Sequence, residues 1–380
     1  MAIIQKGYHS NEDYVDFINY VFGMNGTPSS SFETLLPKLY RAGRQTDKDT
    51  YFAIDNDRIV GAVLSYPLTF RADGKVFTAR GIGSVSTHPR HRGEGFMKDL
   101  MKAAIDDMIK DDIDISVLGG RRHRYAHFGF EKCDGMMYFS ITPKTVSYVK
   151  PDRKGITVRE VKADDSALLD LLYEKMHQRP YYTERPREDL HDILCSWRAR
   201  PYAFFRGDAL VGWAVHYVSK RQFSEFCSLD PALTQAMVAV AIDTFGSLSI
   251  AIPAYDHTLA GEVDVLAEDV NVISNECFLV LNWQRVLSTL LSFLNDKRPL
   301  IDGTLTVTIE GTKETVSLKL SVKDGKTSVD LTDEAPEITL SQTEAEAFFF
   351  RNYSALRAKV NPPAASWLPL PLFIFEPDNV

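Results

Sequence analysis

The stretch Gly81-Ile-Gly-Ser-Val-Ser-Thr-His-Pro-Arg-His-Arg-Gly-Glu-Gly-Phe-Met-Lys98 decides the fold of this chain. Its first half is rich in short and β-branched residues, which favour an extended strand. Beyond the turn, the apolar residues follow the helical period at Phe96, Met97, Leu100, Met101, Ala104, Ile105, Met108 and Ile109. The sequence therefore predicts a strand, a break at Pro89, a basic glycine-containing turn and a helix.

The turn between this strand and this helix predicts an anion site. The backbone N–H groups of residues 93–97 lie where the helix begins, and such an end offers unpaired donors and partial positive charge. Gly93 and Gly95 allow a ligand to approach the backbone closely. Residues 90–92 are Arg-His-Arg and add positive charge around the turn. Phosphate groups are the ligands that this pattern favours.

Length and composition predict a soluble protein of two or three domains. The chain has 380 residues, of which 44% are hydrophobic and 25% charged. Its net charge of −8 argues against general nucleic-acid binding and mildly favours a cationic substrate. The four cysteines lack metal-ligand spacing, so we expect reduced thiols and no metal site. Without a long apolar run, we expect a cytoplasmic protein that does not bind membranes.

Three units follow one another along the chain. The first is an α/β unit that closes at a linker near residue 150, with further strands predicted at 51–54, 59–66, 113–120 and 136–141. The second, from residue 156, repeats this order of hairpin, helix and strand, but its strand-to-helix junction at 227–232 has no glycine turn and no arginine. The third, from about residue 285, is an α+β unit with helices at 286–294 and 343–352 and alternating strands at 304–310 and 316–322.

Two motifs make the first unit resemble the GNAT acetyltransferase superfamily. After Pro89, the segment Arg92-Gly-Glu-Gly95 matches the family's Arg-x-x-Gly turn, although Met97 stands where a small residue is usual. The later segment Tyr125-Ala-His-Phe-Gly-Phe130 matches the family's Tyr-x-x-(Phe/Leu)-Gly-Phe pattern. The two motifs occur at the separation that the family shows, with a strand, a helix and a strand between them.

The whole chain resembles one branch, the enhanced-intracellular-survival (Eis-like) N-acetyltransferases, in which a bulky residue at the position of Met97 is normal. The resemblance implies an α/β (α+β) multidomain fold. Residues 1–150 would be the catalytic GNAT domain, and 151–284 a degenerate second GNAT domain. Residues 285–380 would be a sterol-carrier-protein-like domain whose C-terminal tail returns to the active site.

The same resemblance implies an acetyl-CoA-dependent N-acetyltransferase whose acceptor is a primary amine, such as an aminoglycoside, a polyamine or a lysine side chain. It also implies a homo-oligomer, often a hexamer. By the family's pattern, a backbone N–H near Val85 polarises the acetyl carbonyl, and the strand ending at Gly119-Gly120 splays away from the strand at 81–87. The residues expected to contact acetyl-CoA are Val85, Ser86, Thr87, Arg92, Gly93, Glu94, Gly95, Phe96, Met97, Lys98, Gly120 and Arg121.

Two groups are expected to move protons. Tyr125 is the expected general acid, because a phenol is protonated at neutral pH. The resemblance implies that the C-terminal carboxylate, here that of Val380, is the general base. This tail ends on valine where many members end on an aromatic residue, so Glu376 and Asp378 remain alternatives.

The acceptor and two other functions stay open at this point. Phe17, Phe22 and Phe32 are candidates for the acceptor pocket, although their pattern also fits a plain core. A hydrophobic-ligand carrier built on residues 286–380 would show an open apolar cavity between sheet and helices. A non-catalytic regulator would bind acetyl-CoA without turnover.

Overall fold

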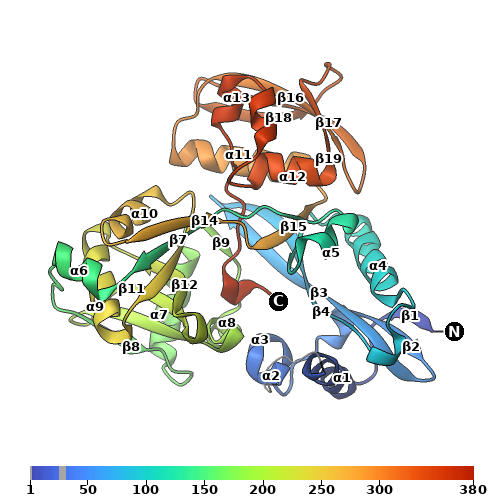
Figure 1. Cartoon of the computed structure of the whole chain (residues 1–380), viewed down its shortest axis with the longest axis horizontal. Coiled ribbons are helices and arrows are strands. Elements are labelled where there is room, and N and C mark those ends of the chain that lie inside the picture. Colours follow the sequence, from blue (N-terminus) through green and yellow to red (C-terminus); the bar gives the residue numbers. More distant parts are fainter. Residues whose placement is uncertain (1, 25–30) are drawn as a thin grey trace.

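The computed structural model describes residues 2–24 and 31–380, which form three units, each built on one sheet (Figure 1). Strand β9 (Tyr181–Thr183) pairs with an inner strand, β3, of the first sheet. In order across that sheet, the strands are β1 (Ile3–Lys6), β2 (Thr50–Asp55), β3 (Arg58–Ala72), β4 (Lys75–Thr87), β5 (Ile115–Gly119), β15 (Glu276–Val280) and β6 (Glu131–Lys132).

The second sheet has the same arrangement of strand directions as the first. In both sheets the fourth and fifth strands are parallel, β4 with β5 and β12 with β13, and the other neighbours in the order are antiparallel. In the corresponding order, its strands are β8 (Ile156–Glu160), β10 (Ala199–Arg206), β11 (Ala209–Tyr217), β12 (Gln222–Ser228), β13 (Leu248–Pro253), β7 (Met136–Ile141) and β14 (Asp269–Ile273).

The two sheets exchange one strand in each direction. Strand β7 precedes the expected boundary near residue 150 but lies in the second sheet. Strand β15 falls within the expected second domain, 151–284, but lies in the first sheet. Helix α6 (Pro143–Val149) goes with β7, and its Val146 is buried in the core of the second unit. The sheets therefore do not separate at residue 150. A strand pattern in the sequence identifies a strand but not its partner, which is why the exchange was not foreseen.

Helices cover both faces of the first sheet. Helix α4 (Phe96–Lys110) packs on one face, against a core that contains Tyr51 and Ala53 of β2. Helices α1 (Asn11–Gly23), α2 (Phe32–Leu35) and α3 (Pro37–Tyr40) lie on the other face, whose core contains Phe52, the residue between those two. Ser10 caps the start of α1 by accepting a hydrogen bond from the N–H of Asp13.

The second unit carries the helices α7 (Ser166–His177), α8 (Leu190–Leu194), α9 (Thr234–Phe245) and α10 (His257–Asp264). The third unit has a four-stranded sheet with β18 (Lys326–Leu331), β17 (Thr315–Lys323), β16 (Gly303–Glu310) and β19 (Ile338–Ser341). Its helices are α11 (Trp283–Lys297), α12 (Gln342–Phe350) and α13 (Pro362–Ser366). Asp324 and Gly325 both have positive φ between β17 and β18, as a tight two-residue hairpin turn requires.

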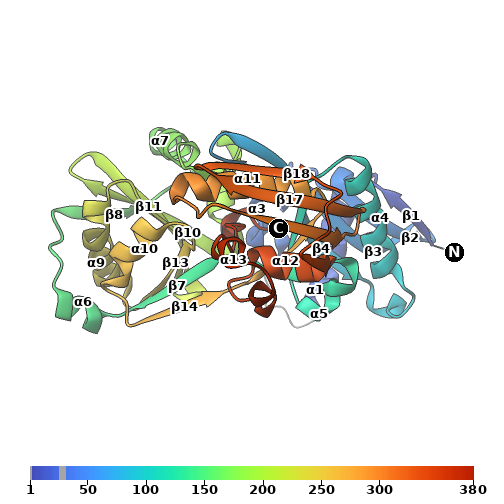
Figure 2. The same ribbon diagram turned by 90° about the horizontal axis from the view of Figure 1, so that it is seen from above.

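The chain after α13 leaves the third unit and runs between the other two, so that the C-terminus lies near the middle of the molecule (Figures 1 and 2). A 3₁₀ turn at Glu376–Asp378 precedes the last two residues. Cys133 and Cys277 are buried, Cys195 and Cys227 half-buried, and all four are free thiols. Among the described residues, no helix is both long and apolar enough to cross a membrane.

Candidate active site

Strands β4 and β5 separate at the end of their pairing. Their parallel register runs from Ala79 opposite Ile115 to Gly81 opposite Val117. Beyond this point β4 continues to Thr87 without β5, and β5 turns its other edge to β15. The two strands therefore open a slot between them, as the glycines at the end of β5 predicted.

A β-bulge shapes the β4 side of this slot. The register with β3 moves from Leu64 opposite Gly83 to Ala62 opposite Ser86, so two residues of β4 face one residue of β3. Ser84 in the bulge has φ +48°, and its hydroxyl lies 2.5 Å from the hydroxyl of Tyr40. A bulge leaves backbone groups outside the ladder, and Val85 lies in this bulge.

The turn after β4 has the geometry of an anion site. Gly93 and Gly95 have φ of +89° and +91°, and Gly95 is the N-cap of α4. A Cβ would meet open space at both glycines, so the left-handed backbone is what requires them. Within the described part of the chain, the N–H groups of residues 93–97 donate to no backbone carbonyl. The N–H of Lys98, by contrast, donates to the Gly95 carbonyl at 2.9 Å. Its backbone is therefore not free to bind acetyl-CoA, although Lys98 was expected to contact it.

The side chains of this turn divide into two kinds. Glu94 is exposed and lies 3.3 Å from His91, and Arg92 is also exposed. Phe96 and Met97 are half-buried and pack against the core beneath α4, and the Phe96 ring also lies near His91. Such packing explains why a bulky residue is tolerated at position 97.

A cavity of about 640 Å³ lies at the open end of the slot. Of the residues predicted for acetyl-CoA contact and proton transfer, it brings together Val85, Gly120, Arg121, Tyr125 and Val380. The other predicted contacts do not line it. Ser86 is buried and its hydroxyl faces the Ala62 carbonyl 3.5 Å away, Thr87 lies further along β4, and residues 92–98 form the turn and the start of α4.

Tyr125 ends the short helix α5 (Arg122–Tyr125) and is 6% exposed. Its ring lies against the backbone of Gly120, where a Cβ would come within 2.5 Å of a ring carbon. Burial raises the pKa of the Tyr125 phenol, and the positive charge of Arg124 opposes this only in part. The phenol is therefore protonated at neutral pH and can donate a proton into the cavity.

The C-terminal residue occupies a seat made by glycines of β4. A Cβ on Gly83 would lie 3.1 Å from the carboxyl carbon of Val380, and a Cβ on Gly81 would lie 2.6 Å from its Cγ2. Val380 is 7% exposed. In the described part of the chain, no Lys, Arg or His side chain lies within ion-pairing distance of its carboxylate. The carboxylate can therefore accept a proton in the cavity.

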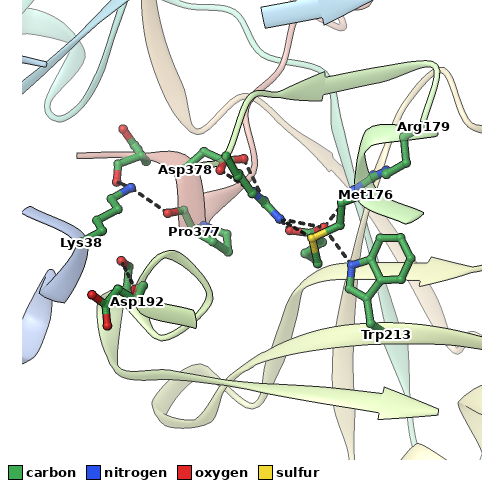
Figure 3. A network of polar contacts seen from close by, with 11 residues as sticks. Lys38, Met176, Arg179, Asp192, Trp213, Pro377 and Asp378 are labelled. Carbon is green, nitrogen blue, oxygen red and sulfur yellow. Dashed lines mark hydrogen bonds and ion pairs between the residues drawn. The ribbon is translucent and has the colours of Figure 1, made fainter. Parts of the chain in front are cut away.

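The tail that ends in this seat is held by three basic side chains. Lys38 of α3 donates from Nζ to the carbonyls of Pro377 and Asn379, both at 2.7 Å (Figure 3). Arg185 donates to both carboxylate oxygens of Asp378, at 2.7 and 2.9 Å. Lys220 pairs with Glu376 at 2.8 Å.

This arrangement separates the three candidate bases. Asp378 and Glu376 are engaged in ion pairs and do not line the cavity of Tyr125, whereas Val380 does. Burial lowers the pKa of Lys38 to about 7. A neutral amine still offers two N–H donors, so Lys38 can bind both carbonyls at a pH above this pKa as well as below it.

Lys38, Arg185 and Trp197 were not identified from the sequence. Trp197 comes from the second unit, lines the cavity and packs against the core cluster that contains Val380. Trp197 and Arg198 both have positive φ, of 61° and 59°, which residues other than glycine seldom adopt. No sequence pattern signals such a contact between distant segments.

The phenylalanines proposed for the acceptor pocket also divide. Phe22 and Phe32 line the cavity, and Phe17 is buried in the neighbouring core instead. A helical pattern fixes which residues face inward, but it does not tell a cavity wall from a filled core.

Comparisons with known proteins agree with this geometry. Residues 9–133 match the acetyltransferase (GNAT) domain family, and no curated protein sequence matches the chain. The structure is similar to a GCN5-related N-acetyltransferase from Anabaena variabilis, with a TM-score of 0.69, 14% identity and coverage of 99% of this chain and 98% of that chain. For a GCN5-related N-acetyltransferase from Kribbella flavida, the TM-score is 0.69 and the identity 16%, and the match covers 99% of this chain and 98% of that chain. For Eis1 from Mycobacterium abscessus, the TM-score is 0.68 and the identity 15%, and the match covers both chains completely.

These three structures match nearly the whole chain, but at low sequence identity, so they show that the fold is similar and no more. The family match covers only the N-terminal part of the chain, which contains the slot, the glycine turn and Tyr125. Residues 9–133 thus match the GNAT acetyltransferase domain family, within a chain whose α/β multidomain fold is similar to that of Eis1.

Proposed function

We propose that the protein transfers the acetyl group of acetyl-CoA to a primary amine, in the cavity that contains Tyr125 and Val380. The observation that carries this proposal is the position of the chain's last residue, seated on Gly81 and Gly83 in the same cavity as Tyr125. A C-terminal tail buried to this extent, and clamped by Lys38 and Arg185, is otherwise hard to explain on an acetyltransferase domain.

The slot and the turn suit a nucleotide thioester. The free N–H groups of residues 93–97 and the start of α4 would hold the phosphates, with Arg92 beside them. Gly120 and Arg121 border the slot through which a long, narrow arm would pass. At its end, the backbone N–H of Val85 would donate to the acetyl carbonyl and stabilise the negative charge that develops there. When bound, acetyl-CoA supplies the activated acetyl group.

Two protons move during transfer. The Val380 carboxylate accepts one from the attacking amine as the new C–N bond forms, and the Tyr125 phenol donates one to the sulfur as the C–S bond breaks. The products are the acetylated amine and free CoA, and the two groups return to their starting forms by exchange with water. Burial raises the pKa of the Tyr125 phenol, so this group holds the proton that its step needs.

The other two units would position this site. The matching strand directions of the two sheets support a second GNAT fold in the second unit. We propose that this fold is degenerate, because the junction between β12 and α9 has no glycine in the left-handed conformation. The third unit, proposed to be sterol-carrier-protein-like, has a core filled by side chains of α11 and α12, including Leu287, Leu290 and Phe348. Such packing supports a scaffold that carries the tail.

Tyr125→Phe is expected to lower kcat by about two to three orders of magnitude, because the sulfur then leaves without a proton donor. The affinity for acetyl-CoA, measured by calorimetry, should change little, since the ring and its contact with Gly120 remain. Release of free CoA in the presence of an amine panel measures the turnover. Unchanged turnover in this variant would exclude Tyr125 as the acid, and a wild-type protein that binds acetyl-CoA without any turnover would support the regulatory alternative.

Gly83→Ala is expected to lower kcat by about tenfold or more without loss of folding, because the new methyl lies 3.1 Å from the carboxyl carbon of Val380 and displaces it. Gly261→Ala is the matched control, since that glycine lies in α10 and a Cβ there meets nothing within 4 Å. Steady-state kinetics and thermal unfolding of both variants provide the comparison. Equal activities of the two variants would show that the exact position of Val380 is unimportant.

A further inference from the structure

We infer that the acceptor is a monoamine whose amino group is carried on an apolar body of aromatic size, and not a polycation such as a polyamine or an aminoglycoside. This inference rests on the proposed acetyl transfer and concerns the same cavity. It departs from the acceptors that the family resemblance implied.

The acceptor side of the cavity is apolar. The wall opposite the slot is made by α1, α2 and the segment around Trp197, and five of its side chains are large and apolar: Phe22, Phe32, Leu35, Leu36 and Trp197. Phe32 packs edge-on against both Phe22 and Tyr40, so this wall is held in a fixed shape. An apolar group of an acceptor gains free energy by burial against such a wall.

The charges of the cavity do not suit several ammonium groups. None of its described lining residues is Asp or Glu, and its charged side chains are Arg121 and Arg124. Residues 25–30, which are not described, include no acidic residue in the sequence. A polycation would therefore enter a site with two guanidinium groups and no acidic side chain, and leaving water without an anionic partner is costly for each of its charges.

One ammonium group, in contrast, has one partner. The Val380 carboxylate is the only anionic group among the described residues that line the cavity. It would attract the ammonium form of the acceptor. After that form has lost one proton to water, the carboxylate accepts the second as the C–N bond forms, as in the proposed transfer. After this pairing no second carboxylate remains, so additional ammonium groups on the acceptor would stay unpaired.

The direct test measures kcat/KM of the full-length protein from CoA release, with n-propylamine through n-hexylamine, phenethylamine, spermidine and kanamycin. We expect kcat/KM to rise about three- to fourfold for each added methylene until the cavity is filled. The kcat/KM for phenethylamine should exceed that for spermidine by about 10- to 100-fold. Higher kcat/KM for spermidine or kanamycin than for phenethylamine overturns this inference and leaves acetyl transfer intact. Failure of every amine to release CoA overturns the acetyl-transfer proposal together with the inference.

A variant tests the charge directly. Leu35→Glu places a carboxylate on the half-buried edge of the apolar wall. We expect it to lower kcat/KM for phenethylamine by about tenfold and to raise kcat/KM for spermidine, which reverses the preference. Val218→Glu adds the same charge at an exposed position of the second unit and should leave the preference unchanged. A folded Leu35→Glu protein with wild-type preference contradicts the inference, and the wild-type amine series decides it if that variant does not fold.

Discussion

Deletion of Val380 alone is expected to lower kcat by about two to four orders of magnitude, the range typical of losing a positioned general base. The shortened chain still has a terminal carboxylate, but on Asn379, about 3.3 Å back along the tail. The carbonyl of Asn379 accepts a hydrogen bond from Nζ of Lys38 at 2.7 Å, and this contact would hold the new carboxylate at that position. The new carboxylate therefore cannot simply move forward into the seat on Gly81 and Gly83.

Val380→Ala separates the carboxylate from the valine side chain. It keeps the terminal carboxylate in place and removes only the methyl groups that lie near Gly81. We expect a loss in kcat of less than about tenfold, because the base remains and only packing is lost. The pH dependence of kcat adds a second measurement: the fall in rate toward acid pH that reports an essential base should be present in Val380→Ala and weak or absent in the deletion. A deletion variant with wild-type kcat would show that the C-terminus is not the base.

Local patterns predicted the parts of the site that are continuous in sequence. The strand, the glycine turn and α4 follow from residues 81–98, because β propensity, glycine conformations and helical periodicity are properties of neighbouring residues. The position of Tyr125 beside Gly120 was also within reach, since the two are only five residues apart. For such features the sequence carries the physical cause itself.

The parts that depend on distant segments were not predictable in the same way. Lys38 and Arg185 look like ordinary surface charges in the sequence, yet each is about 95% buried because it meets the tail. Arg185 and Asp378 are 193 residues apart along the chain. The exchange of β7 and β15 is of the same kind, because the choice between two sheets depends on how both units pack. Only the resemblance to a family suggested that the tail would return to the first unit.

The ion pairs of the tail suggest what the second unit does for the reaction. Arg185 joins Asp378 of the tail to Glu225 of β12, and Glu225 also accepts from Arg179 and from Nε1 of Trp213 (Figure 3). Glu225 is fully buried, and the positive charges of Arg185 and Arg179 lower its pKa despite that burial. The second unit thus provides a buried, charged anchor for the tail that ends at Val380.

Breaking this anchor should have a large effect on stability. Arg185→Met is expected to lower the free energy of unfolding by about 3–5 kcal/mol, because it leaves the carboxylate of Asp378 buried without its ion-pair partner and removes one of two arginines from Glu225. The exposed pair of Arg153 and Asp243, also bidentate with both distances 2.9 Å, provides the control. Arg153→Met should cost no more than about 1 kcal/mol and leave kcat unchanged, because exposed ion pairs contribute little. Thermal or denaturant unfolding of both variants measures the difference.

Asp378→Asn distinguishes anchoring of the base from general stability. It removes the charge on the tail but keeps the pair between Arg185 and Glu225, so we expect a smaller loss of stability than in Arg185→Met. The loss of kcat should nevertheless be about tenfold or more, because a tail that is held less firmly positions the Val380 carboxylate less well. The affinity for acetyl-CoA should remain close to that of the wild type, since the glycine turn and the slot are untouched. If the folded Asp378→Asn protein keeps wild-type kcat, then Lys38, Lys220 and the glycine seat hold the base without help from Arg185.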